Sequence, residues 1–296
     1  MKRVGYLGPR GTFTERATRL LFPGEELLPF QTIPQAMDKA WANVVDYAVV
    51  PVENAIEGSV NLTLDYLIHK RRMPILASVT IDISHHLLVS EKNASKDFVP
   101  KKVLSHPQAV AQCHDFLQKT YPTIEIEYVS STGAAAAWVE AHPEEQVCAI
   151  ANQQAAETYH LHTAKENIHD YDYNRTRFVV LGNNSKAAEH ITGPYHVGDK
   201  TTLMITLPSD FTGALHQVLS AFAWRKLNLS KIESRPTKTG LGNYFFVIDI
   251  EQRMDDVLVP GAMAELKALG CQVEVLGSYS SYSSQSVVET ETSVNG

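Results

Sequence analysis

The sequence of 296 residues has little cysteine and no long apolar run. Its three cysteines, Cys113, Cys148 and Cys271, stand far apart within apolar patterns, so they match neither a metal-ligand spacing nor a disulfide framework. We expect each of them to be a small core residue. No apolar stretch is long enough to span a bilayer, and the chain begins with a strand-like segment rather than a signal peptide. These absences predict a cytoplasmic protein without a membrane partner.

Positive charge and ligand motifs are also scarce. The net charge is −7 with no basic block, which argues against nucleic acid as a partner. The glycine pair Gly8 and Gly11 lacks a following Gly-Lys-Ser/Thr, so we expect no nucleotide site. His160, His162 and His169 have no carboxylate or cysteine at a suitable spacing, and the adjacent histidines at 85 and 86 point to opposite faces of a strand. The sequence therefore predicts no metal and no cofactor.

A unit of strand, polar cap and helix recurs after residues 7, 104, 129 and 150. Thr12 with Glu15, and Ser105 with Gln108, have the spacing of a capping box at a helix start. The repetition predicts an α/β domain with a largely parallel sheet, in which helix N-termini meet at the carboxyl ends of strands. Such N-termini suit a small polyanion, particularly a dicarboxylate.

An unusual polar set precedes the apolar strand 178–181. Arg175, Thr176 and Arg177 offer a hydroxyl between two guanidiniums, an arrangement suited to an anion from which an oxygen leaves. The alternative is a strand cap with two solvated arginines. Asn54 and Glu57 follow another buried strand, where ligands bind in α/β sheets. Ordinary loop chemistry explains Asn54 equally well and Glu57 better.

The composition shifts after Gly182 and predicts a linker over 183–199. Beyond it the pattern predicts a β-α-β-β-α-β order, the split ferredoxin-like arrangement, over residues 200–277. Its expected strands and helices are 203–207, 213–224, 229–233, 244–250, 261–269 and 272–276. The serine- and threonine-rich tail, 278–296, is predicted to be disordered.

Five motifs then occur in a fixed order. They are Gly8-Pro9-x-Gly11-Thr12-Phe13, the run 50–60 with Glu53-Asn54 and Gly58-Ser59, Ser105-His106-Pro107-Gln108 through Gln112-Cys113, Asn174-Arg175-Thr176-Arg177-Phe178, and Glu233-Ser234-Arg235-Pro236. Together they resemble the prephenate dehydratases that carry a C-terminal ACT domain, over residues 1 to about 277.

This resemblance implies a catalytic domain over 1–182 with a periplasmic-binding-protein-like build and its site in the cleft. Lobe one would comprise about 1–77 and 165–182, and lobe two about 78–164. The implied reaction converts prephenate to phenylpyruvate, CO2 and water without a cofactor, which is the activity of a carbon–oxygen lyase. The implied site residues are Thr176, Arg177 and Phe178 for catalysis, and Thr12, Asn54, Ser105, Gln112 and Thr132 for substrate binding. We expect Thr176 to donate a hydrogen bond to the departing hydroxyl, while arginine and helix N-termini hold the carboxylates.

The resemblance also implies that L-phenylalanine inhibits from a site between paired ACT domains, in a homodimer or homotetramer. The implied effector residues are Gly213, Ala214, Leu215, Asn228, Leu229, Glu233, Ser234 and Arg235. Thr212 and His216 stand where the family usually has proline and valine, which leaves the effector's identity and affinity open. Two alternatives also remain open: an arogenate dehydratase and a non-catalytic amino-acid sensor.

Overall fold

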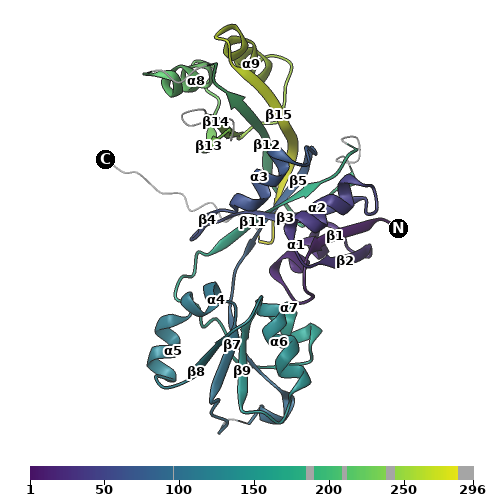
Figure 1. Cartoon of the computed structure of the whole chain (residues 1–296), viewed down its shortest axis with the longest axis vertical. Coiled ribbons are helices and arrows are strands. Elements are labelled where there is room, and N and C mark those ends of the chain that lie inside the picture. The colour runs from purple at the N-terminus through teal and green to yellow at the C-terminus, as the bar shows by residue number, and fades with distance from the viewer. Residues whose placement is uncertain (96, 185–189, 209–211, 238–243, 286–296) are drawn as a thin grey trace. The chain divides into compact units, whose positions relative to one another are not determined.

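The computed structural model describes residues 1–95, 97–184, 190–208, 212–237 and 244–285 (Figure 1). The chain divides into two compact units. The first contains Met1–Arg71 and Thr80–Val179, and the second contains Arg72–Val79 and Val180–Gly296. Two strands, β5 (Ile75–Asp82) and β11 (Arg175–Leu181), have residues in both units.

The first unit contains two sheets, and we call the sheet nearer the N-terminus, with its helices, lobe one. Its strand order is β11-β3-β1-β2, and β1 lies parallel to both β2 and β3. Val4, Ala48 and Val49 are completely buried, as expected for a parallel sheet with both faces covered. The elements of lobe one besides β11 are β1 (Arg3–Leu7), α1 (Phe13–Leu21), β2 (Glu26–Phe30), α2 (Ile33–Trp41), β3 (Tyr47–Asn54), β4 (Gly58–Ser59) and α3 (Asn61–His69).

The second sheet of the first unit and its helices form lobe two. Its strand order is β10-β6-β9-β7-β8; β7 is parallel to β8 and β9, whereas β6 is antiparallel to β9 and β10. Its elements are β6 (His86–Val89), the 3-10 helix η1 (Glu91–Asn93), β7 (Lys102–Ser105), α4 (Pro107–Ala111), α5 (His114–Thr120), β8 (Glu125–Tyr128), α6 (Thr132–Ala141), β9 (Val147–Ala151), α7 (Gln153–Thr158) and β10 (His162–Lys165). The predicted units of strand, cap and helix are therefore confirmed at all four positions.

The two predicted capping boxes have different outcomes. At α1 the Thr12 Oγ1 accepts from the Glu15 N–H at 3.3 Å, which confirms the cap, and the Glu15 carboxylate accepts from the Gly11 N–H at 2.6 Å. The prediction that Ser105 caps α4 is wrong, because His106 is the N-cap and its Nδ1 accepts from the Gln108 N–H. Ser105 ends β7 instead, and its hydroxyl donates to the carbonyl of Ile150 on the neighbouring strand at 2.6 Å.

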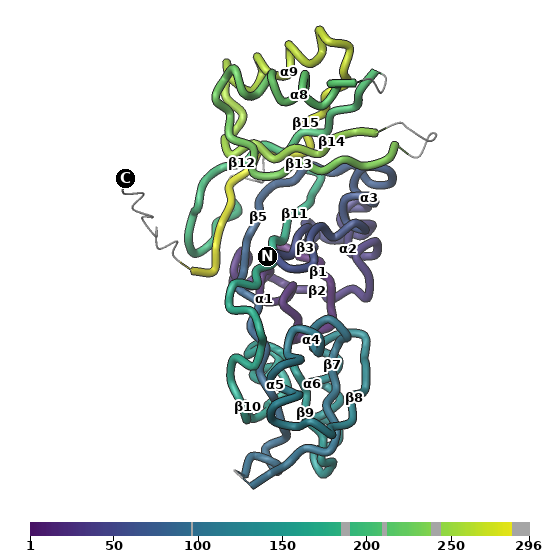
Figure 2. The backbone as a smooth tube through the Cα atoms, turned by 90° about the vertical axis from the view of Figure 1, so that its left-hand side faces the viewer, coloured from purple at the N-terminus to yellow at the C-terminus, as the bar shows by residue number. Residues whose placement is uncertain are grey.

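The second unit has the strand order β13-β14-β12-β15-β5 and confirms the predicted β-α-β-β-α-β sequence. Figure 2 shows α8 and α9 side by side on one face of this sheet. The core beneath them includes Leu203, Phe222, Ile248 and Leu266, all fully buried. The elements are β12 (Tyr195–Thr206), α8 (Ala214–Ala223), β13 (Leu229–Pro236), β14 (Tyr244–Ile250), α9 (Leu258–Ala268) and β15 (Gln272–Ser283).

Two strands of this unit extend into segments that were predicted to be linker or disordered tail. The linker prediction is wrong for 195–199, which belong to β12, and the disorder prediction is wrong for 278–283, which belong to β15. These segments pair with each other, and Tyr279 is fully buried with its hydroxyl 2.9 Å from the Thr202 Oγ1. Of the rest, residues 185–189 and 286–296 lie outside the described residues, whereas 183–184, 190–194 and 284–285 are described and lie outside any strand.

The three cysteines are buried and unpaired, which confirms them as core residues. Within the ranges that the structure describes, no helix is long and apolar enough to cross a membrane. The same ranges contain no group of three histidine, cysteine or acidic side chains placed to hold a metal ion.

Candidate active site

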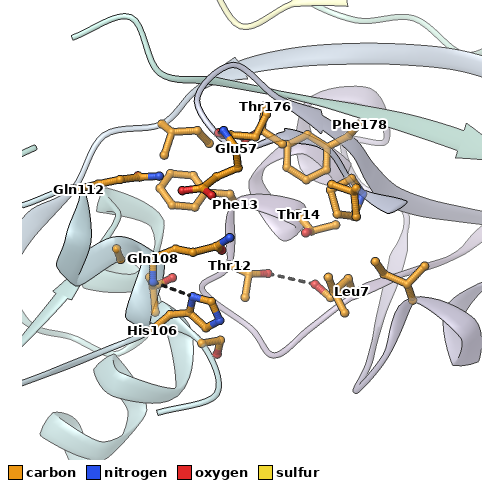
Figure 3. Close-up of a pocket in the computed structure, with 18 of the residues that line it drawn as sticks. Leu7, Thr12, Phe13, Thr14, Glu57, His106, Gln108, Gln112, Thr176 and Phe178 are labelled. Atoms are coloured by element: carbon orange, nitrogen blue, oxygen red, sulfur yellow. Dashed lines mark hydrogen bonds between the residues drawn. The ribbon is translucent and has the colours of Figure 1, made fainter. Parts of the chain in front are cut away.

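A pocket of about 480 Å³ in the first unit is lined by residues of both lobes. It brings together six of the predicted site residues: Thr12, Asn54, Gln112, Thr132, Thr176 and Phe178. Figure 3 shows the Glu57 carboxylate and the Gln112 amide on the same side of the pocket as Thr176, opposite Thr12 and His106. Two predicted residues, Ser105 and Arg177, are not among those that line it.

Thr176 is held by the loop that follows β3. The Asn54 Nδ2 donates to the Thr176 Oγ1 at 2.8 Å and to the Asn174 Oδ1 at 2.9 Å. The Asn54 Oδ1 accepts from the backbone N–H groups of Ile56 and Glu57, at 3.0 and 2.9 Å. Asn54 is thus fixed by its own loop, and it holds the threonine oxygen in turn.

A buried histidine belongs to the same wall of the pocket. His85 is 3 % exposed and its ring meets Phe13 edge to face, with centroids 5.5 Å apart. Its Nε2 lies 3.0 Å from the Gln112 Oε1, which also accepts from the Asn174 Nδ2 at 2.9 Å. Burial lowers the pKa of His85 to about 4, so the ring is neutral at neutral pH.

Arg177 faces a different partner. Its guanidinium binds the Glu53 carboxylate, with the Nη2 at 2.9 Å and the Nε at 3.2 Å from the same oxygen. Arg175 likewise binds Asp82, at 2.9 Å. Among the described residues that line the pocket, none is arginine or lysine, and Glu57 is the one carboxylate.

Two helix starts reach the pocket, α1 from lobe one and α6 from lobe two. Thr12 caps α1 and its hydroxyl donates back to the Pro9 carbonyl at 3.0 Å, so the side chain organises the loop. Ser131 caps α6, and Thr132 in its first turn lines the pocket. The first backbone N–H groups of a helix have no acceptor within it, so both starts present donors here.

The loop before α1 lies directly on α6. A Cβ atom added at Gly133 would lie 2.5 Å from the carbonyl oxygen of Arg10, closer than real contacts allow. The Tyr159 hydroxyl donates to the same carbonyl at 3.1 Å. Contacts between backbone segments thus bring the two helix starts together.

Several lining residues were not predicted from the sequence: Phe13, His85, His106, Gln108 and Ser131. Three of them, Phe13, His106 and Gln108, lie inside the quoted motifs. There the sequence pattern indicates helix caps and spacing residues but not which side chains line a pocket. His85 is harder to predict from the sequence, because the pattern around it raises only the question of a metal ligand.

The predicted effector residues all lie in the second unit. Gly213 caps α8 with a φ of 90°, Ala214 is buried and Leu215 is 41 % exposed. Asn228 precedes β13 and donates to the Glu251 carboxylate. On β13, Glu233 pairs with Lys231 and with Arg235, each at 3.2 Å, whereas Ser234 between them is exposed. Leu229 begins this strand and packs against the core.

Comparison with known proteins identifies relatives of this chain. The prephenate dehydratase family model matches residues 4–186 and the ACT domain model matches residues 201–270. The prephenate dehydratase of Bacillus subtilis is 54% identical over 284 residues, covering 95% of this chain and 99% of that protein. The prephenate dehydratase of Lactococcus lactis subsp. cremoris is 40% identical, covering 95% of this chain and 98% of that protein.

A solved structure extends the likeness to both units. It is the prephenate dehydratase of Arthrobacter aurescens in complex with L-Phe, 32% identical, with a TM-score of 0.78 over 94% of this chain and 89% of that one. The fold is accordingly an α/β catalytic part followed by an ACT domain. The chain belongs to the prephenate dehydratase family.

Proposed function

We propose that the pocket at Thr176 binds prephenate and that the Thr176 hydroxyl assists the loss of the ring hydroxyl. The family's reaction makes the chain a carbon–oxygen lyase that forms phenylpyruvate, CO2 and water. The observation that carries the assignment is the Asn54 amide donating to the Thr176 Oγ1, which leaves the threonine proton to point elsewhere. A donor aimed at the departing oxygen stabilises the charge that develops there.

The reaction needs little from the protein beyond position and charge stabilisation. The bond from the ring to the carboxylate breaks and its electron pair forms a ring double bond, releasing CO2. The bond from the ring to the hydroxyl breaks at the opposite carbon, and the oxygen leaves with its pair as hydroxide, which takes up a proton to become water. The ring becomes aromatic, and this gain drives the step.

Recognition of the two carboxylates falls to neutral donors in this proposal. The described lining residues include no lysine or arginine, and Arg177 is bound to Glu53. Backbone N–H groups at the starts of α1 and α6, with the amide of Gln112, are suitable alternatives. The sequence-based expectation that arginine holds the carboxylates is replaced by this arrangement. The catalytic role of Arg177 and the substrate-binding role of Ser105 remain predictions.

Arogenate is a second candidate substrate, favoured by one observation. Glu57 is an exposed carboxylate on the pocket wall, and it would repel a dianion but attract the ammonium group that arogenate carries. Comparing kcat/KM for both substrates in the wild type and in Glu57→Gln tests this. A loss confined to arogenate supports the candidate, and equal effects on both substrates remove it.

We further propose that L-phenylalanine binds the ACT domain at the residues around α8 and β13 and lowers activity. The L-Phe complex of the Arthrobacter aurescens protein supports this effector. An effector acts only if its affinity differs between two states of the protein. A homodimer or homotetramer with paired ACT domains is part of the proposal, and sedimentation of the protein with and without L-phenylalanine tests it.

The first experiment is a turnover assay with prephenate, following phenylpyruvate, with and without L-phenylalanine. Turnover that L-phenylalanine suppresses supports both assignments. Turnover that is indifferent to L-phenylalanine keeps the pocket assignment and removes the effector. No turnover with prephenate or arogenate would favour the amino-acid sensor and overturn the proposal.

A further inference from the structure

Thr176 is the last member of a chain of side-chain hydrogen bonds. The chain runs from His85 to Gln112 at 3.0 Å, then to Asn174 at 2.9 Å, to Asn54 at 2.9 Å and to Thr176 at 2.8 Å. Its members come from both lobes and from the two segments that connect them. All five side chains lie in or beside the pocket, and four of them line it.

The direction of the chain is fixed by two backbone groups. The N–H groups of Ile56 and Glu57 donate to the Asn54 oxygen, so the Asn54 nitrogen must face Asn174 and Thr176. Asn174 then has to accept through its oxygen. Its nitrogen is left to donate to the Gln112 oxygen. The two backbone N–H groups can only donate, so they determine the orientation of each of these amides in turn.

His85 closes the far end of the chain. The Gln112 oxygen can only accept, so the His85 Nε2 carries a proton and its Nδ1 does not. The ring is almost completely buried, and its Nδ1 has no hydrogen-bond partner among the described residues. The surrounding desolvation keeps the imidazole neutral, which preserves this tautomer.

The fixed directions of these hydrogen bonds have two consequences at the pocket. At one end, the Thr176 oxygen receives an N–H, so its own proton is directed to another acceptor. Further along, only the oxygen of Gln112 is used by His85 and Asn174, so its amide N–H groups are available to a ligand. Reversing any link would present oxygen lone pairs at a site that has to bind an anion.

We propose that His85 and Asn174 are positioning residues that hold the Gln112 amide in its donating orientation, and that Asn174 also binds the Asn54 amide beside Thr176. Each acts on the pocket through its neighbour in this series of hydrogen bonds. The inference rests on the proposed function of the pocket and adds to it the two residues that orient the Gln112 amide.

The sharpest test is Asn174→Asp, which keeps the shape but replaces a donor with an acceptor facing the Gln112 oxygen. We expect kcat/KM for prephenate to fall about 10- to 100-fold with a raised KM, since the Gln112 amide proposed to bind a carboxylate is turned away and a misplaced group costs up to about 10²-fold. Asn167→Asp is the matched control, because it puts the same charge on an exposed residue of the same connecting segment. An Asn174→Asp enzyme that matches this control overturns the inference.

A second pair of variants addresses His85 without adding a charge. His85→Gln retains an N–H donor toward Gln112, and His85→Phe fills the space without one. We expect His85→Gln to retain about tenfold more kcat/KM than His85→Phe, at equal melting temperatures. Equal kcat/KM in the two variants would mean that the donor has no part in positioning, and this also decides the question if Asn174→Asp does not fold.

A double-mutant cycle separates this inference from the proposed function. With Gln112→Ala already present, adding Asn174→Asp should lower kcat/KM by less than about threefold, because the amide that Asn174 orients is gone. Additive losses would overturn the inference. Normal turnover in Thr176→Ala alone would instead overturn the role of Thr176 itself.

Discussion

The pocket and the predicted effector surface are organised in opposite ways. In the pocket, buried and half-buried polar side chains join residues 27 to 122 positions apart, from His85 with Gln112 to Asn54 with Thr176. On β13 of the ACT domain, Glu233 pairs with Lys231 and Arg235, each two positions away, and Ser234 is exposed. The described contacts of the pocket join distant parts of the chain, whereas the described ion pairs of β13 join near neighbours on one strand.

This difference predicts how far from its own position a substitution affects the protein. A change in the pocket alters a group that another part of the chain holds in place, and buried polar groups lose much when a partner is removed. A change on β13 disturbs ion pairs between side chains that lie two positions apart on one strand, so its effect should remain local. The following predictions test this contrast.

The largest effect is expected at Thr176. Thr176→Ala should lower kcat by about 10²- to 10³-fold, the usual effect of removing one aligned donor, with little change in KM or in L-phenylalanine binding. Steady-state kinetics with prephenate and calorimetric titration of L-phenylalanine measure the two regions separately. Thr176→Ser, which keeps the hydroxyl, is the control. A twofold change in Thr176→Ala would remove the assigned role.

Burial of His85 should make the stability of the fold depend on pH. Its pKa is about 4 in the folded state against about 6.5 unfolded, so the unfolded chain binds more protons between these values. Stability is therefore fully present above about pH 6.5 and falls as the pH drops toward 4, by up to about 3 kcal/mol from this group. Urea unfolding at several pH values measures the slope.

His85→Gln should reduce this slope without abolishing it. Burial also lowers the pKa of His86 and His106, and the nearby His169 disfavours the charged form of both His85 and His86. The same slope in wild type and His85→Gln would mean that the imidazole is solvated in the folded protein.

Arg177→Met distinguishes a structural arginine from a catalytic one. Loss of the Glu53 ion pair should lower the free energy of unfolding by about 1–2 kcal/mol, because the guanidinium is mostly buried while the carboxylate is partly solvated. Arg175→Met removes a more exposed pair in the same strand and should cost no more than about 0.5 kcal/mol. A kcat loss as large as that of Thr176→Ala would instead support the predicted catalytic role.

The smallest effect is expected on β13. Glu233→Gln should weaken L-phenylalanine inhibition by about three- to tenfold, since it removes the carboxylate that orders Lys231 and Arg235, and leave kcat without effector unchanged. Glu274→Gln, which breaks an exposed pair with Arg72 in the same unit, is the control. Equal inhibition in both variants would place the effector elsewhere.

Much of the fold could be predicted because local signals agreed with the tertiary structure. Thr12 with Glu15 and the buried strand before Asn54 each gave the correct element. Local reasoning was wrong at Ser105, where Pro107 at the first helical position moves the cap to His106. It was also wrong after Ser278, where the composition resembles a disordered tail. Backbone pairing with β12 and the burial of Tyr279 order this segment despite its composition. Neither can be predicted from the neighbouring residues in the sequence.

The sequence predicted which residues belong to the site better than it predicted the contacts between them. Six predicted residues share the pocket, yet the sequence did not indicate that Arg177 binds Glu53 across adjacent strands. Nor did it indicate that His85 and Asn174 complete a chain to Thr176. These relations depend on which strands lie side by side, and the spacing of residues along the chain does not contain that information.

Gly133 shows that the pocket is maintained against local preference. It lies within α6 at an ordinary helical position, where alanine would favour the helix by about 1 kcal/mol. An alanine methyl, however, has no room beside the Arg10 carbonyl. Any side chain at this position would move the loop of α1 away from α6 and widen the distance between the two sets of donors. In the proposed binding mode, the absent side chain thus sets an upper limit on how far apart two carboxylates can be while both are still bound.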